Sequence, residues 1–240
     1  MFYLSYVGYE LKKWMRDSLT SFMVFYPLLL GLVGRYVIPL ADQRTHVNLE
    51  AYYHVILTAL ILFVSRISGS VAAFSILDDR DDNILYSVKV APLSLEFFIG
   101  LKLLMVFVLS FAGAAFILWF SDLVTLPTGV LFAVAFLASM GCPLTTLVIN
   151  CVASNKVEGF AAVKALNSLV IFAIASLFFW DKKEFLFAFE PGFWPAKALS
   201  TAIIGEEVMQ LSYNSYYAIG LAYALLLNIG AYMAFKKRVH

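Results

Sequence analysis

The densest group of reactive side chains in the sequence is an acidic run, Asp78-Asp79-Arg80-Asp81-Asp82. Asp78, Asp79 and Asp82 have the two-plus-one spacing of carboxylates that can hold Mg²⁺ on a diphosphate, and hard cations prefer such oxygen clusters. Prenyl or diphosphate transfer normally uses a second acidic cluster. The remaining aspartates stand alone: Asp17, Asp42, Asp122 and Asp181. A membrane-embedded, magnesium-dependent lipid-modifying enzyme is therefore one hypothesis, with half of its expected site missing.

The residues after the acidic run indicate recognition of a protein instead. Ile84, Leu85 and Val88 lie at helical spacing on one face, and Pro92 would end the helix. We expect this helix to begin at the acidic run, whose charges suit its positive end. An apolar patch on a charged loop commonly marks a protein partner. The alternative is a solvated turn whose apolar residues lie against the membrane.

Arg66 is a third candidate because it falls deep inside an apolar stretch. It precedes Leu77 by eleven residues, about 16 Å along a helix axis, which places it near the middle of a membrane. A charge at that depth costs at least about 2.5 kcal/mol, so the guanidinium should face a polar cavity, a carboxylate or backbone carbonyls. No acidic residue lies at matching depth in another apolar stretch. A structural role is therefore as plausible as a place in a transport pathway.

Other catalytic constellations are missing from the sequence. His46, His54 and His240 are too scattered for a metal site or a catalytic triad. Cys142 and Cys151 are expected to pack as apolar side chains. No G-x-x-x-x-G-K-[ST] motif occurs, so the chain has no phosphate loop of its own. If ATP powers its activity, another polypeptide must hold the nucleotide and its magnesium.

The elements that position these residues are predicted to be membrane-spanning helices. Hydrophobic residues make up 62% of the 240 residues and charged residues 14%, whereas soluble domains have about 45–50% and about 25%. Apolar runs of about 20 residues, enough to cross about 30 Å of hydrocarbon, predict six spans. The runs cover residues 20–40, 53–77, 95–120, part of 123–155, 160–180 and 216–235. We therefore expect an all-α integral membrane protein with one domain over 20–240.

Charge distribution predicts the orientation of these spans. With both termini on one side, eleven Lys and Arg residues fall there and four on the other. The positive-inside rule then places both termini in the cytoplasm of a multi-pass cell-membrane protein. The inner loops are 78–94 and 154–164, and short apolar segments in the outer connection, 181–215, suggest re-entrant or interfacial helices. The formal net charge of +1 gives no indication of a nucleic-acid partner.

Residues 1–19 are predicted to form an amphipathic helix on the inner leaflet. Its apolar stripe includes Leu4, Leu11 and Trp14, whereas its basic residues fall elsewhere on the helical wheel. The cationic face would meet anionic membrane lipids. The helix is either a generic anchor or an elbow that braces a moving domain.

In this order, the features resemble the permease subunits of ABC exporters of the second type, often called type V. Residues 10–17 resemble the family's elbow, and 78–88, the Pro-Leu-Ser step at 92–94 and then Lys102 resemble its first coupling helix. The loop 154–164, with its Lys-Val-Glu-Gly run, is similar to the second cytoplasmic contact of members described as drug or fluoroquinolone exporters. The Pro-Gly-Phe-Trp-Pro segment of the outer connection resembles the family's re-entrant helices. Aspartates and an asparagine stand where many members have glutamates and a glycine.

The resemblance implies a transport subunit that is not itself an enzyme. Such a subunit pairs with a second permease copy or homologue, binds two cytosolic ABC ATPases, and moves an amphiphilic drug, peptide or lipid outward by alternating access. The implied ATPase-coupling residues are Asp78, Asp79, Arg80, Asp81, Asp82, Ile84, Leu85, Val88, Pro92, Lys156 and Glu158. Arg66 becomes a candidate for the translocation pathway. The magnesium-dependent enzyme and an immunity-type membrane protein remain the alternatives.

Overall fold

The computed structural model describes residues 18–45, 48–82 and 95–239, together with positions 8, 12 and 16. Within these residues the regular structure is helical throughout. The prediction of six helices long and apolar enough to cross a membrane is confirmed. These are Phe25–Arg44, Glu50–Asp81, Glu96–Phe120, Thr128–Val152, Lys156–Ser176 and Tyr213–Arg238. The predicted elbow falls almost entirely outside the described residues.

The helices follow one another in a simple order. The first span contains α2 (Ser18–Leu32), the π-helical turn η1 (Val33–Val37) and α3 (Ile38–Thr45). The short η2 (Glu50–Tyr52) leads into α4 (Tyr53–Asp81), which is followed by α6 (Leu95–Phe120). The fourth span consists of α7 (Thr128–Ser139) and α8 (Gly141–Val152), and the fifth of α9 (Lys156–Ser168) and α10 (Val170–Ser176). The outer connection contains η3 (Lys182–Phe187), α11 (Phe193–Ile204) and η4 (Glu206–Val208) before α12 (Tyr213–Val239).

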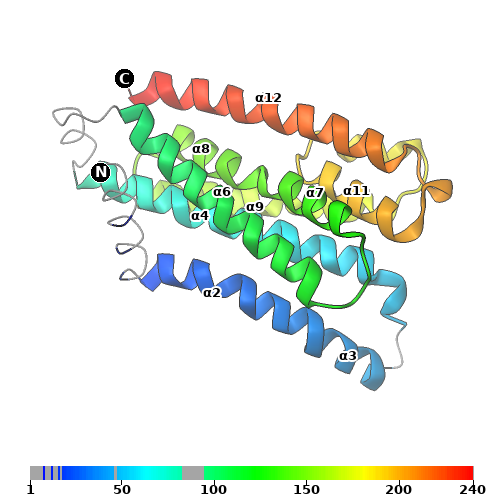
Figure 1. The fold of residues 1–240 in the computed structure, drawn as a ribbon. Helices are drawn as coiled ribbons and strands as arrows, with labels where there is room; N and C mark the ends of the chain where they lie inside the picture. The colour runs from blue at the N-terminus through cyan, green and yellow to red at the C-terminus, as the bar shows by residue number, and fades with distance from the viewer. Residues whose placement is uncertain are drawn as a thin grey trace.

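Helix α4 is the centre of the bundle (Figure 1). It contacts α2, α6, α7, α8, α9, α10 and α11, and 72% of its apolar window is buried, against 17% for the first and last spans. In Figure 1, α2 and α12 lie on opposite edges with α4 between them. The start of α2 and the end of α12 lie at the same end of the bundle, as six spans require. Following the predicted orientation, we call this end, which also carries the α8–α9 turn, the inner end, and the opposite end the outer end.

Small residues on α4 let α8 approach its backbone closely. Thr146 Oγ1 donates a hydrogen bond to the carbonyl of Gly69 at 2.9 Å, and Asn150 Nδ2 donates to the carbonyl of Ala73 at 3.3 Å. Small residues at a membrane helix interface allow such contacts, and polar side chains bonded across it are satisfied without water. The α4–α8 pair is therefore both close-packed and hydrogen-bonded.

Gly69→Ala is expected to destabilise the protein because the α4–α8 contact leaves no room for a side chain. A Cβ at Gly69 would lie 2.5 Å from the carbonyl oxygen of Cys142 and 2.8 Å from Thr145 Cβ. Forcing the helices apart should lower the free energy of unfolding by about 1–3 kcal/mol. Gly100→Ala is the matched control, because a Cβ there meets nothing within 4 Å and alanine favours the helix by up to about 1 kcal/mol. Equal thermal unfolding midpoints for the two variants in detergent would contradict the tight contact.

The fourth span is broken at Met140, between α7 and α8. Pro143 has no amide to donate to the carbonyl of Ser139, so the helix cannot continue regularly through this turn. Asn228 Nδ2 of α12 donates to the carbonyl of Met140 at 3.0 Å. The break therefore exposes polar backbone in the middle of the bundle, and another span supplies a partner for it.

Candidate functional site

The two inner loops predicted to contact a partner meet each other at the inner end of the bundle. Lys156 Nζ, at the start of α9, lies 2.6 Å from Asp78 Oδ1, near the end of α4. A Cβ at Gly159 would lie 2.8 Å from Leu77 Cδ1 and 3.0 Å from Phe74 Cε1, so α9 rests directly on α4. These contacts connect the first turns of α9 to the last turns of α4.

Local hydrogen bonds fix where α9 begins. Asn155 Oδ1 accepts from the backbone N–H of Glu158 at 3.0 Å, and Glu158 Oε2 accepts from the N–H of Ser154 at 2.7 Å. The arrangement is similar to a capping box: Asn155 satisfies an N–H of the first turn, and Glu158 satisfies the N–H of the residue just before the cap. Glu158, a predicted coupling residue, therefore holds the turn in shape with its carboxylate.

Other polar contacts join neighbouring spans at the same end. Arg238 of α12 donates to Ser154 Oγ at 2.7 Å, Arg80 of α4 donates to the carbonyl of Ala153 at 3.2 Å, and Lys236 of α12 forms an ion pair with Glu96 of α6. These contacts join α4 and α12 to the α8–α9 turn and join α12 to α6.

Two apolar side chains stand out on this charged end. Val157 is 80% exposed and Phe160 is 55% exposed, and they belong to the first turns of α9 beside Lys156. We call Asp78, Lys156, Val157 and Phe160 the inner surface. Exposed apolar residues among charged groups are typical of a protein interaction site.

The prediction that the acidic run begins a helix is wrong. Its first members lie in the last turn of α4, which ends at Asp81. Asp79 is 1% exposed and forms an ion pair with Lys102 of α6, and Lys102 Nζ donates to Ser75 Oγ at 3.3 Å. Because α6 crosses α4 here, the Asp79 carboxylate is buried against the charge of a lysine of α6. Asp81 and Asp82 are exposed. The remaining predicted residues of this loop, Ile84, Leu85, Val88 and Pro92, lie outside the described residues.

The acidic run does not converge on a single point, as a magnesium–diphosphate site would require. Asp78 faces Lys156, whereas Asp79 faces Lys102. Across the part of the chain that the structure describes, no three potential metal ligands gather. Hard cations need several oxygens on one ion. The described geometry therefore lends no support to the enzyme hypothesis.

Arg66 forms a buried ion pair with Glu190. Its Nη1 also donates to Thr145 Oγ1 of α8 at 3.1 Å. Glu190 comes from the outer connection, just before α11, and Arg66 lies thirteen residues after the start of α4 and fifteen before its end. The expectation that no other span places an acidic residue at this depth is not contradicted, because Glu190 lies between the fifth and sixth spans. The carboxylate arrives on a connecting segment too short to be recognised as a span.

A small cavity lies beside this pair, where four elements meet. Its volume is about 10 Å³, room for about one water. It is lined by α4, by both halves of the broken fourth span, by α12 and by residues 191–195 of the outer connection. Burial raises the pKa of Glu190, and Arg66 with the amides of Gly192 and Phe193 opposes that shift. Ser65 Oγ is buried without a hydrogen-bond partner.

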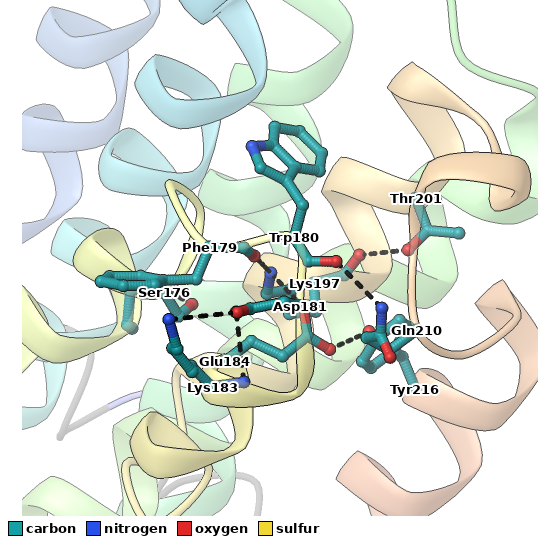
Figure 2. Close-up of polar contacts among 11 residues, drawn as sticks. Ser176, Phe179, Trp180, Asp181, Lys183, Glu184, Lys197, Thr201, Gln210 and Tyr216 are labelled. Atoms are coloured by element: carbon teal, nitrogen blue, oxygen red, sulfur yellow. Dashed lines mark hydrogen bonds and ion pairs between the residues drawn. The ribbon is translucent and has the colours of Figure 1, made fainter.

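A second cluster of buried charges lies in the outer connection (Figure 2). Lys197 Nζ lies 2.6 Å from Glu184 Oε2 and donates to the carbonyl of Phe179 at 2.8 Å. Tyr216 of α12 donates its hydroxyl to the other oxygen of Glu184. Burial lowers the pKa of Lys197, and Glu184 opposes that shift. This cluster joins η3, α11 and α12.

Glu184 and Glu190 were not predicted as site residues, and Lys197 was predicted only as an outer charge. Glu190 and Lys197 offered a signal, since each is a single charge flanked by apolar residues, whereas Glu184 directly follows Lys183. A lone charge in an apolar segment requires a buried partner, but its sequence position does not identify that partner.

Together, the fold and these sites define a polytopic α-helical membrane protein, with charges paired inside the bundle and an exposed inner surface. A family profile described as "Fluoroquinolones export permease protein Rv2686c-like" matches residues 10–232. The chain therefore belongs to this family of drug export permeases.

Two curated relatives support the family assignment. They are the Fluoroquinolones export permease protein Rv2686c of Mycobacterium tuberculosis (strain ATCC 25618 / H37Rv) and the Fluoroquinolones export permease protein MT2760 of Mycobacterium tuberculosis (strain CDC 1551 / Oshkosh). Each is 30% identical over 196 residues, and the match covers 78% of this chain and 77% of the relative. No solved structure matches significantly.

Proposed function

We propose that this chain is the membrane subunit of an ATP-driven ABC exporter. It would pair with a second copy or a homologue and bind two cytosolic ATPases, which hold ATP and Mg²⁺. Its substrate would be an amphiphilic molecule, with fluoroquinolone-like drugs as the first candidates because of the names of its relatives. The observation that carries the proposal is the inner surface, where both inner loops join and two apolar side chains are exposed among charges.

The mechanism we propose is alternating access. Closure of the ATPase dimer would push on the inner surface, and α9 and α4 would move together because Asp78 pairs with Lys156 and Gly159 packs on α4. Since α4 runs through the centre of the bundle, its displacement would reach Arg66 and the outer connection. Rigid-body motion of packed helices is a common way of transmitting such a change.

The same proposal includes a topology. Both termini would be cytoplasmic, and η3 and α11 would form a re-entrant segment on the outer side. The support for the re-entrant segment is the position of Arg66. This residue lies about 20 Å along the helix axis from either end of α4, and Glu190 of the outer connection reaches it there. Membrane lipids would surround the exposed apolar faces of the spans.

Val157→Asp is expected to release the ATPase from the transporter. A buried carboxylate in the docking contact should weaken binding at least about tenfold, about 1.4 kcal/mol. Tagged protein would be purified from its native host in mild detergent, and the co-purified ATPase and its activity measured. Val208→Asp is the matched control, since it makes the same change at an exposed apolar residue in η4, in the outer connection.

An ATPase retained by wild type and by Val208→Asp but lost from Val157→Asp would support the proposal. Equal retention by all three proteins would contradict docking at the inner surface. No ATPase in any sample would contradict the exporter assignment itself and favour the immunity-type or enzymatic alternatives.

A further inference from the structure

The buried pair Arg66–Glu190 differs from an ordinary structural ion pair in its surroundings. It joins α4 to the outer connection beside the break in the fourth span, and these elements would separate during alternating access. One buried polar atom next to the pair, Ser65 Oγ, has no hydrogen-bond partner. The adjoining cavity of about 10 Å³ holds no more than about one water, so each charge is compensated chiefly by the other.

We infer that Arg66 and Glu190 form the recognition site for amphoteric substrates, which carry both a carboxylate and an ammonium group. This inference rests on the proposed export function and names the substrate class of that site. When the outer connection moves away from α4, Arg66 would bind the substrate carboxylate and Glu190 its ammonium group. Thr145 Oγ1 on α8 already accepts a hydrogen bond from Arg66 and would keep the guanidinium oriented.

Charge balance supports this substrate class over the others. A neutral molecule has no charge that could replace either partner in the Arg66–Glu190 ion pair, so the ion pair would remain intact. A molecule with one charge would satisfy one residue and leave the other buried without a counter-charge, which is strongly unfavourable. A molecule with both charges replaces one buried ion pair with two. Selectivity would therefore come from opposite charges on one substrate more than from its apolar shape.

Ligand binding to the full-length protein in lipid nanodiscs tests this inference. The probes are ciprofloxacin, which has a carboxylate and a basic piperazine nitrogen, its methyl ester, which lacks the anion, and its N-acetyl derivative, which lacks the cation. Wild type should bind ciprofloxacin at least about tenfold more tightly than either derivative. In the double variant Arg66→Met with Glu190→Gln, the three affinities should become similar.

The control removes another Arg–carboxylate pair of the same chain. Arg35 Nη1 lies 3.6 Å from Asp122 Oδ2, and both side chains are partly exposed, so Arg35→Met with Asp122→Asn should keep the wild-type preference.

Three results would each overturn the inference. They are equal binding of the three probes to wild type, no binding of any probe, and a preference that survives in Arg66→Met with Glu190→Gln. The comparison of the three probes on wild type does not depend on the folding of any variant. The ATPase pull-down tests the exporter assignment separately. If wild type prefers ciprofloxacin but no ATPase co-purifies, the recognition site would be supported and the exporter assignment contradicted.

Discussion

Replacing Asp79 with alanine is expected to lower the free energy of unfolding by about 3–5 kcal/mol, since it removes the carboxylate from a buried ion pair. Asp79 and Lys102 are nearly inaccessible, and Lys102 also lies 5.0 Å from the centre of the Phe98 ring. The substitution would take this carboxylate away from the buried ammonium, and the ion pair that joins α4 to α6 would be lost.

Two further variants make the Asp79 experiment specific. Asp82→Ala removes an exposed carboxylate just after α4 and should change stability by no more than about 0.5 kcal/mol. Combining Asp79→Leu with Lys102→Met replaces the pair with apolar groups and should recover most of the loss. Thermal unfolding of the purified proteins in detergent, analysed as a double-mutant cycle, measures these differences. If Asp79→Ala and Asp82→Ala unfold at the same temperature, the buried pair does not stabilise the bundle.

Glu184→Ala should have an effect of similar size at the outer end, about 3–5 kcal/mol of lost stability. Its carboxylate compensates Lys197, whose Nζ is 2.6 Å away, and accepts the hydroxyl of Tyr216. Both Glu184 and Lys197 are fully buried, so removing the carboxylate leaves a buried ammonium facing mainly the carbonyl of Phe179. The variant should also make the outer connection more sensitive to proteolysis, since η3, α11 and α12 lose their common contact (Figure 2).

Asp181→Ala is the control for the outer cluster. Asp181 lies in the same connection, and its Oδ2 is 3.5 Å from Lys183 Nζ, but both side chains are more than half exposed. Water screens such a pair, so its loss should cost about 1 kcal/mol or less. Thermal unfolding and limited proteolysis would be measured on both variants. An unchanged Glu184→Ala protein, or an Asp181→Ala protein equally damaged, would contradict the assigned role of the buried cluster.

The described residues contain buried ion pairs at three levels of the bundle. Asp79–Lys102 lies toward the inner end, Arg66–Glu190 in the middle, and Glu184–Lys197 in the outer connection. A charge inside a membrane domain requires an internal partner, because lipid provides none. The inner and outer pairs join neighbouring helices, whereas the middle pair lies beside a cavity and a helix break. That difference is why the middle pair is assigned to substrate recognition.

The sequence by itself determined the class of fold and the position of each span. Bilayer thickness fixes how many consecutive apolar residues a helix needs, so runs of about 20 such residues identify spans without any knowledge of their packing. The absence of a phosphate loop and the two charged inner loops were equally local features, and they led to a transport subunit with an external source of energy. The family match over residues 10–232 agrees with the transport part of that prediction.

Only the tertiary structure decided which charges meet. Arg66 and Glu190 are 124 residues apart, and their contact depends on how far the outer connection turns back along α4, which no local pattern records. The neighbours Asp78 and Asp79 are identical in type, yet one meets Lys156 beside solvent and the other is buried against Lys102. Successive residues of a helix point about 100° apart, so the crossing of α4 with α6 and α9 separates their roles. Local spacing determines which residues share a face, whereas the burial and partner of a charge depend on long-range packing.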